Sequence, residues 1–347
     1  MIHWIVLVAM SLIVPEFERF CELVGQNNRV PVVATLICDE LTPVGAFARL
    51  QAGSSHAFLL ESVVGGEKIA RYSFLGADPA VSFEVTRRQV HIRDRLAARA
   101  REATSADPLA LLEEELRKYR AVHLPGLPRF LGGAVGYAGY DTVRYYERLP
   151  AAPADDRGLP DLLFDIYETL VIFDHVHKTV LVVAHAAVDA GMSFKGLKRA
   201  YYQARERIEG VIEQISQPIS MRPVQVILPA PALERYASNF DQAGFERVVA
   251  ACQEYIRAGD IFQVVTSQRL QVDTRAQPFD IYRALRVINP SPFMFYLKTP
   301  PVTLVGASPE VMCRVEDGVV TNRPLAGTRH RGGYGGGRRT VAPGVAG

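Results

Sequence analysis

The stretch DLLFDIYETLVIFDHVHKTVLVVAHAAV, Asp161 to Val188, is the part of the sequence that indicates the fold class most directly. It contains two runs rich in β-branched, aliphatic and aromatic residues, and the polar tetrapeptide HVHK joins them. Two apolar runs of strand length with a short polar link between them predict an antiparallel β-hairpin.

Short strands of the same kind are expected before this hairpin, for example in HAFLLESVV and PAVSFEVTRRQVHIRD. GGAVGYAGY, Gly132 to Tyr140, lacks the spacing and the lysine of a phosphate-binding loop, so it is expected to be a strand whose glycines allow close backbone approach. Strands outnumber helices and do not alternate with them regularly, which favours an α+β fold with antiparallel sheets over a doubly wound parallel sheet.

Two helices interrupt the strands before residue 220. The first has Asp107 as its N-cap and Pro108 at its first position, and its apolar face is expected to carry Leu109, Leu112, Leu116 and Tyr119. The second is a longer, charged helix that begins near Phe194.

A further amphipathic helix is predicted in the second half of the chain, ending at a left-handed Gly259. Its apolar face holds Phe245, Val248, Val249, Cys252 and Ile256. The segment IFQVVTSQRLQV that follows is predicted to be a strand. Its alternation places Gln263 and Ser267 on one face, either on an exposed sheet surface or lining a polar cavity.

NPSPFMFYL, Asn289 to Leu297, predicts a stiff elbow between a helix and an apolar strand. Each proline pushes the residue before it out of the helical region, so the preceding helix must end there. The elbow is either a simple connector or one wall of a pocket for a small planar ligand. Farther on, Asp317-Gly318 predicts a tight hairpin turn.

Composition excludes several classes of function. The net charge is +2, with 39 Lys and Arg against 37 Asp and Glu, so neither a nucleic-acid partner nor a membrane partner is expected. The four cysteines, at positions 21, 38, 252 and 313, lie too far apart for a zinc motif or a disulfide framework, which fits a cytoplasmic location. The apolar run Trp4–Val14 is too short to span a membrane and has no basic residue of a secretory signal before it.

Seven separated motifs carry a family resemblance. In chain order they are LLESV, RYSFLG, GGAVGYAGYDTVRYYERLP, YIRAGDIFQVV, NPSPFMFY, LVGASPE and RPLAGTR. Together they closely resemble the large subunit (component I) of anthranilate synthase, over residues 15–332. The resemblance implies an α/β/β/α sandwich with two mainly antiparallel sheets. It also implies that chorismate and ammonia are converted to anthranilate and pyruvate, with Mg²⁺ holding the substrate carboxylate.

The resemblance also implies partners and site residues. A separate glutamine amidotransferase subunit (component II) would supply ammonia, and L-tryptophan would act as a feedback inhibitor. Gly327 and Thr328 fall where the family binds chorismate. Gln263 falls where sister enzymes that add water carry a lysine base, so glutamine is consistent with the ammonia-dependent branch. The tryptophan-binding positions correspond to Ser62, Pro292, Phe293 and Met294.

The resemblance divides the chain into four regions. Residues 1–14 are expected to be an atypical extension with the true start at Met10, 15–220 the tryptophan-binding region, and 221–332 the start of the chorismate-binding region. Residues 333–347 are expected to be a frameshifted tail. The family's magnesium glutamates and catalytic histidine follow the AGTR motif, so the fold is expected to be incomplete at its C-terminus and the chain inactive.

Three other interpretations remain open at this stage. The chain could be component I of aminodeoxychorismate synthase, which shares the fold and the first chemical step. It could be a non-catalytic tryptophan-binding or subunit-docking fragment, or a broken gene product without function. Product analysis distinguishes the first from anthranilate synthase, and tryptophan binding without turnover would favour the second.

Overall fold

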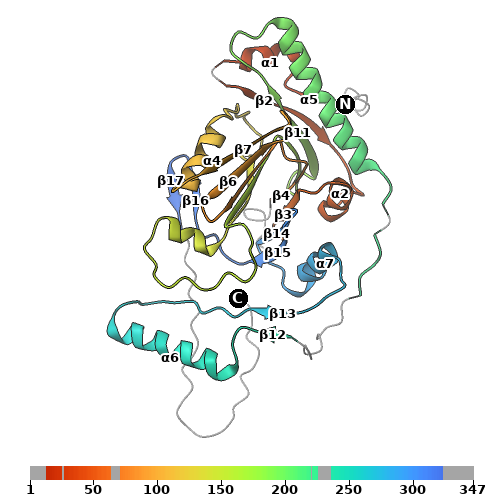
Figure 1. Ribbon diagram of the computed structural model, residues 1–347. Coiled ribbons are helices and arrows are strands. Elements are labelled where there is room, and N and C mark those ends of the chain that lie inside the picture. The colour runs from red at the N-terminus through yellow and green to blue at the C-terminus, as the bar shows by residue number, and fades with distance from the viewer. Residues whose placement is uncertain (1–12, 26, 64–70, 220, 226–235, 323–347) are drawn as a thin grey trace.

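The computed structural model describes residues 13–25, 27–63, 71–219, 221–225 and 236–322, and it contains two antiparallel β-sheets with helices on their outer sides (Figure 1). The larger sheet has eight strands in the order β1-β2-β11-β10-β4-β3-β14-β15. Its strands are β1 (Ile13–Val14), β2 (Arg29–Leu36), β3 (Ala57–Glu61), β4 (Tyr72–Ala77), β10 (Thr169–Asp174), β11 (Thr179–Ala187), β14 (Phe293–Lys298) and β15 (Thr303–Ser308).

Four helices cover one face of the eight-stranded sheet. They are α1 (Phe17–Leu23), α2 (Pro43–Leu50), α5 (Phe194–Ser216) and α7 (Pro278–Ile288). The main hydrophobic core lies between them and the sheet, where Phe20, Phe47, Ile208 and Tyr282 are fully buried. The elbow ends α7 at Ile288 and leads into β14, as the prolines predict.

The smaller sheet has five strands in the order β7-β6-β5-β9-β8. These are β5 (Val81–Thr86), β6 (Gln89–Asp94), β7 (Arg99–Thr104), β8 (Gly133–Ala138) and β9 (Leu162–Tyr167), with the 3₁₀ helix η2 (Tyr140–Tyr145) after β8. The helix α4 (Pro108–Arg117) packs against this sheet. The arrangement confirms the α/β/β/α sandwich with antiparallel sheets.

The predicted start of α4 is confirmed, but its packing face is partly wrong. The Asp107 side chain accepts a hydrogen bond from the backbone amide of Ala110. Leu112 is buried, whereas Leu109 is exposed and Glu115 is buried instead. The carboxylate of Glu115 forms ion pairs with Arg101 and Lys118, which makes its burial tolerable.

The chain passes from one sheet to the other at Glu168. The hairpin of β10 and β11 is confirmed, but residues 161–174 do not form one strand: β9 belongs to the five-stranded sheet and β10 to the eight-stranded sheet. Glu168 accepts a hydrogen bond from Arg29 Nε at 2.5 Å through its side chain and one from the His185 amide at 2.9 Å through its carbonyl. Hydrophobicity alone does not reveal this crossing, because both halves of the run are buried.

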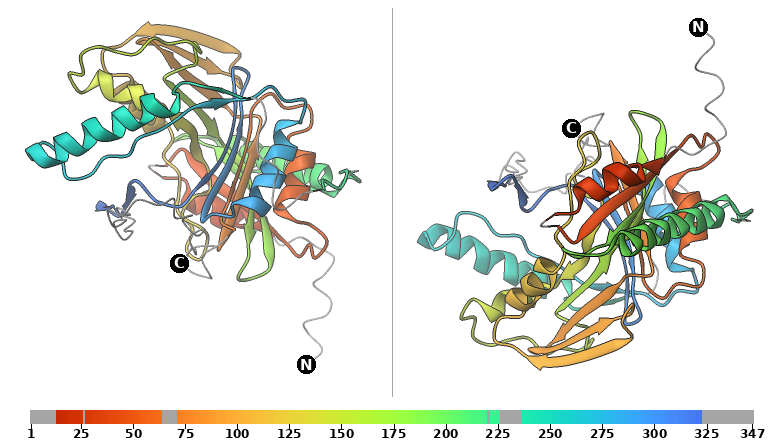
Figure 2. Two further views of the ribbon diagram at one scale, coloured as in Figure 1. Left: turned by 90° about the horizontal axis from the view of Figure 1, so that it is seen from below. Right: turned by 90° about the horizontal axis from the view of Figure 1, so that it is seen from above.

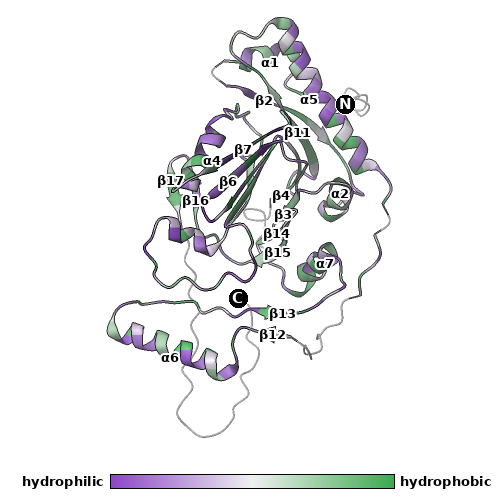
Figure 3. Cartoon of the chain, in the orientation of Figure 1, coloured by the Kyte–Doolittle hydropathy of each residue, from purple (hydrophilic) through white to green (hydrophobic). Residues whose placement is uncertain are grey.

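The segment after residue 235 differs most from expectation. Helix α6 (Gln242–Ala258) ends at Gly259 with φ of 83°, as predicted, but none of its residues is buried and it extends away from the sheets (Figures 2 and 3). The strand expected over residues 261–272 is wrong except for β13 (Leu270–Gln271), which pairs with β12 (Ala237–Ser238). In the part of the chain that the structure describes, the rest of this segment has no neighbouring strand to pair with.

The last two described strands form the predicted hairpin. They are β16 (Arg314–Glu316) and β17 (Val319–Thr321), and Asp317 and Gly318 between them both have positive φ angles. Strands β14 and β15 pair in one sheet with β3, so residues on both sides of the expected boundary at 220 share this sheet. The boundary itself stays a prediction. No helix of the described residues is long and apolar enough to cross a membrane.

Asp174 gives a testable prediction about the β10–β11 turn. Burial by itself would raise its pKa, but hydrogen bonds from Arg71 and from the amides of Val176 and His177 outweigh burial and lower the pKa to about 2. The ordinary pKa of Asp is about 3.9, so the ionised form stabilises the fold above that pH and loses this contribution as the pH falls toward 2.

We therefore expect Asp174→Asn to lower the free energy of unfolding by about 1 kcal/mol near neutral pH, allowing for solvent screening around the partly exposed Arg71. The difference between wild type and variant should shrink in urea titrations as the pH is lowered from about 6 toward about 3. If the free energies of unfolding of wild type and Asp174→Asn differ equally at both pH values, the stabilising role assigned to ionised Asp174 is wrong.

Candidate functional site

The structure brings Ser62 and the proline elbow together at one end of two paired strands. In the register of β3 and β14, Glu61 lies opposite Met294 and Leu60 lies opposite Phe295. Just beyond these pairs, the amide of Val63 donates a hydrogen bond to the carbonyl of Ser291 at 3.3 Å. Two segments that are far apart in the sequence therefore form one local structure.

The hydroxyl of Ser62 is one of a few buried side-chain polar atoms without a hydrogen-bond partner among the described residues. Side chains alternate along a strand, so Ser62 lies on the same sheet face as Leu60. Most buried polar groups have a partner, so an unpaired hydroxyl at this position is well suited to bind a polar group of a ligand.

An apolar groove of about 530 Å³ lies between the two sheets on the face that carries Leu60. Its lining residues come from both sheets and from the segment before β8. They are Leu60, Phe74, Phe130, Ala134, Val135, Gly136, Tyr137, Phe164, Phe295, Leu297 and Leu304. A mainly apolar groove with few polar groups nearby is typical of sites for small aromatic ligands.

The three elbow residues predicted to bind tryptophan do not share one environment. Pro292 and Phe293 are half-buried at the start of β14. Met294 is 1% exposed and packs in the core on the helix side of the sheet, together with Tyr282 and Tyr296. The Met294 side chain therefore packs against the helices, on the face of the sheet that points away from the groove. Phe293 lies on the other face of β14, the face that carries Phe295 and, on the neighbouring strand, Ser62.

A buried polar network fixes the end of β3 to helix α7. The Tyr282 hydroxyl donates a hydrogen bond to Glu61 Oε2 at 2.6 Å, and Arg286 Nη2 donates to Glu61 Oε1 at 3.2 Å. Burial raises the pKa of Glu61, although the charge of Arg286 and both hydrogen bonds oppose the rise. The only sequence signal for this network is a glutamate inside an apolar run, because its partners lie on a helix more than 200 residues away.

None of the predicted site residues that the structure describes is among those that line the groove, and Ser62 and Phe293 are only neighbours, in the paired strands, of its lining residues Leu60 and Phe295. Gln263 lies on the exposed segment between α6 and β13 and is not among the residues that line the groove. Gly327 and Thr328 lie outside the described residues. The roles of all three in chorismate chemistry stay predictions.

The described residues do not fit a magnesium ion. Among them, no group of three or more His, Cys, Asp or Glu side chains is placed so that it could hold a metal.

Comparisons with known proteins agree on one family. Residues 55–334 match the family described as chorismate binding enzyme. The chain is 41% identical over 321 residues to anthranilate synthase component 1 of Acetivibrio thermocellus and 40% identical over 320 residues to that of Pseudomonas putida. These alignments cover 92% and 91% of the chain, and the chain spans 63% of the length of each relative.

A solved structure gives the same result. The crystal structure of anthranilate synthase component I from Streptococcus pneumoniae matches with a TM-score of 0.57 and 28% sequence identity. The match covers 82% of this chain and 59% of that one. The likeness extends to both the sequence and the arrangement of the strands.

Proposed function

Because the chain belongs to the chorismate-binding enzyme family, we propose that it functions as an anthranilate synthase component I whose inter-sheet groove binds L-tryptophan as a feedback inhibitor. The observation that carries the regulatory part is the buried hydroxyl of Ser62 beside the proline elbow, which has no hydrogen-bond partner among the described residues. The relatives named anthranilate synthase component 1, at about 40% identity over most of the chain, support the enzymatic part.

The proposed reaction converts chorismate and ammonia into anthranilate, pyruvate and water. Nitrogen adds to the ring, the C4 hydroxyl leaves as water, and elimination of pyruvate makes the ring aromatic. A glutamine amidotransferase subunit would supply the ammonia in a cytoplasmic complex. The magnesium requirement and the chorismate contacts of Gly327 and Thr328, which the resemblance implies, stay predictions.

The groove fits an indole ring for physical reasons. Phe74, Phe130, Phe164 and Phe295 contribute aromatic surface, on which a planar ring can pack edge-to-face or offset. The amino acid head group needs hydrogen bonds, and the Ser62 hydroxyl can donate or accept one. The Glu61 network holds this end of β3 in place, so the hydroxyl is positioned before the ligand arrives.

Isothermal titration calorimetry of the purified chain with L-tryptophan tests the regulatory part directly. We expect saturable binding of one L-tryptophan per chain and at least tenfold weaker binding of D-tryptophan, whose head group cannot reach the same hydroxyl with the ring in place. Absence of L-tryptophan binding by a folded chain would contradict the proposal.

Product analysis separates the two candidate enzymes. A full-length relative that keeps the LLES and NPSPFMFY motifs is incubated with chorismate, ammonium and magnesium, and the products are separated by chromatography. Anthranilate is the expected product. Accumulation of aminodeoxychorismate in its place would favour aminodeoxychorismate synthase component I.

A further inference from the structure

A buried hydrogen-bonded pair connects the two sheets at a point that neither the motifs nor the proposed ligand site involves. His56 directly precedes β3 of the eight-stranded sheet, and Asp165 lies in β9 of the five-stranded sheet. His56 Nδ1 lies 2.8 Å from Asp165 Oδ2, and the two side chains are only 7% and 2% exposed. The pair is therefore a direct polar contact across the interior of the sandwich.

Only one oxygen of the Asp165 carboxylate takes part in this contact. The other oxygen, Oδ1, is buried and has no hydrogen-bond partner among the described residues. A carboxylate can accept hydrogen bonds through both oxygens, and an unpaired buried acceptor is costly. Asp165 therefore needs a second donor at Oδ1.

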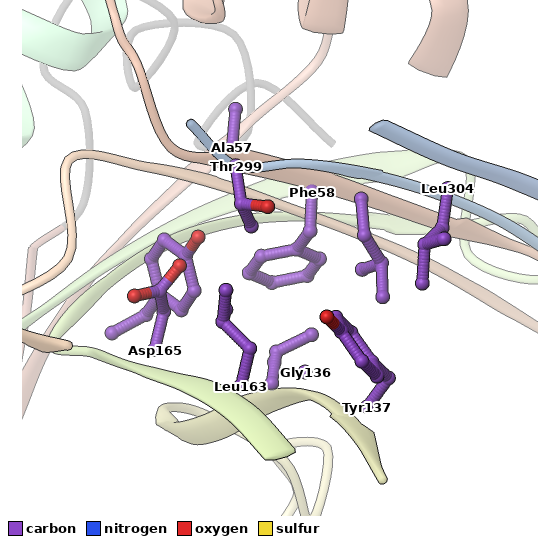
Figure 4. A pocket seen from close by; sticks show the side chains of 11 residues that line it. Ala57, Phe58, Gly136, Tyr137, Leu163, Asp165, Thr299 and Leu304 are labelled. Carbon is purple, nitrogen blue, oxygen red and sulfur yellow. The ribbon is translucent and has the colours of Figure 1, made fainter. Parts of the chain in front are cut away.

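A small cavity adjoins Asp165. Figure 4 shows Asp165, Thr299 and Tyr137 around it, together with the apolar side chains of Phe58, Leu163 and Leu304. The cavity has a volume of about 10 Å³, which is about the minimum that one water molecule requires.

The walls of the cavity offer polar partners besides Asp165. Thr299 Oγ1 donates its proton to the Val302 carbonyl at 2.7 Å, so its oxygen can still accept a hydrogen bond. Tyr167, another lining residue, lies close to Asp165: burial and, next, the charge of the Asp165 carboxylate raise the pKa of its phenol, which can donate or accept a hydrogen bond. A molecule bound here can therefore donate to Asp165 and make at least one further hydrogen bond.

We propose that this cavity is a binding site for one water molecule, which donates a hydrogen bond to Asp165 Oδ1 and completes a polar bridge between the sheets with His56. A water molecule fits because it is small enough for the volume and supplies two donors. An apolar gas atom would leave Oδ1 unpaired.

The small cavity beside the bridge adjoins the proposed ligand groove. Five residues line both the small cavity and the groove: Val135, Gly136, Tyr137, Leu297 and Leu304. The bridge therefore helps to set the distance between the sheets where the cavity meets the groove. His56 and Asp165 are positioning residues, since they act on the groove through its walls.

A crystal structure of the wild-type chain at about 1.8 Å resolution or better tests the water site. We expect one water within about 2.6–3.2 Å of Asp165 Oδ1. An empty cavity, a metal ion in it, or a protein donor on Oδ1 would overturn the proposal. Asp165→Asn, which keeps an acceptor oxygen, should retain the water, and Asp165→Leu should lose it.

A second measurement tests the positioning role, which rests on the proposed function of the groove. Asp165→Leu should raise the Kd for L-tryptophan about threefold or more, whereas the control His91→Gln should leave it unchanged. His91 forms a similar pair with Glu102, at 3.3 Å, but on the exposed side of the five-stranded sheet. An unchanged Kd in a folded Asp165→Leu variant would refute the positioning role.

The two measurements test separate claims, so one claim can be refuted without the other. If the wild-type chain binds no L-tryptophan, the proposed function of the groove is wrong, and the water peak still decides whether the bridge exists. If Asp165→Leu does not fold, Asp165→Asn and the wild-type density decide the water site. For the positioning role, His56→Gln then replaces Asp165→Leu, with the same expected rise in Kd.

Discussion

Gly136→Ala is expected to lower the free energy of unfolding by about 3 kcal/mol or more, the upper range for overpacking a well-packed interior. A Cβ atom at this position would lie 1.9 Å from the carbonyl oxygen of Leu163 and 2.6 Å from the Cα of Phe164. Both atoms belong to the backbone of β9, which pairs with β8 at this point. Since no side-chain rotation can relieve the contact, the strands themselves would have to separate.

The control for this prediction is Gly210→Ala. Gly210 lies in α5, and a Cβ there would meet nothing within 4 Å. Alanine in a helix interior is favoured over glycine by roughly 0.5–1 kcal/mol, so this variant should be slightly more stable than wild type. Urea unfolding monitored by circular dichroism measures both. A loss below about 1 kcal/mol for Gly136→Ala would show that β8 tolerates displacement.

Ser62→Phe is expected to weaken L-tryptophan binding tenfold or more, and to relieve feedback inhibition in an intact enzyme by a similar factor. Losing a buried polar contact costs about 1–3 kcal/mol, and about 1.4 kcal/mol corresponds to a tenfold change. The phenyl ring also occupies space on the face that Ser62 shares with Leu60, so the ligand would be displaced as well as deprived of a hydrogen bond.

Two further variants separate these causes. Ser62→Ala removes only the hydroxyl, so its effect should be smaller than that of Ser62→Phe. Ser308→Ala is the matched control, because Ser308 lies opposite Phe293 in β15 but its hydroxyl already donates to the Glu310 carbonyl. Calorimetric titration with L-tryptophan gives the order of the three variants' affinities directly. An unchanged affinity in folded Ser62→Phe would refute the tryptophan site.

Local features of the fold were predictable from the sequence because neighbouring residues determine them. The N-cap of α4 at Asp107, the left-handed Gly259 and the turn at Asp317-Gly318 depend on residues within one turn of chain, and all three are confirmed. The elbow likewise ends α7 where its prolines require. These predictions needed no knowledge of tertiary packing.

The errors and omissions arise where distant segments meet. Residues 261–272 have the alternation of a strand, but a strand forms only where a partner lies beside it. The crossing at Glu168 depends on Arg29, and the contact of His56 with Asp165 spans 109 residues. Of the candidate site, the sequence predicted the association of Ser62 with the elbow through a family resemblance, but it predicted neither the Glu61 network nor the groove.

The position of β14 also has a consequence during protein synthesis. In the finished sheet β14 separates β3 from β15, so β3 lacks its neighbour on that side until residue 298 has left the ribosome. At about 5–20 residues per second, translation from β3 to the end of β14 takes roughly ten to fifty seconds. Throughout that time the nascent chain exposes a strand edge with the sequence AFLLE, which can pair with another polypeptide. Between the translation of β3 and that of β14 this edge therefore leaves the emerging chain open to aggregation and to binding by a chaperone.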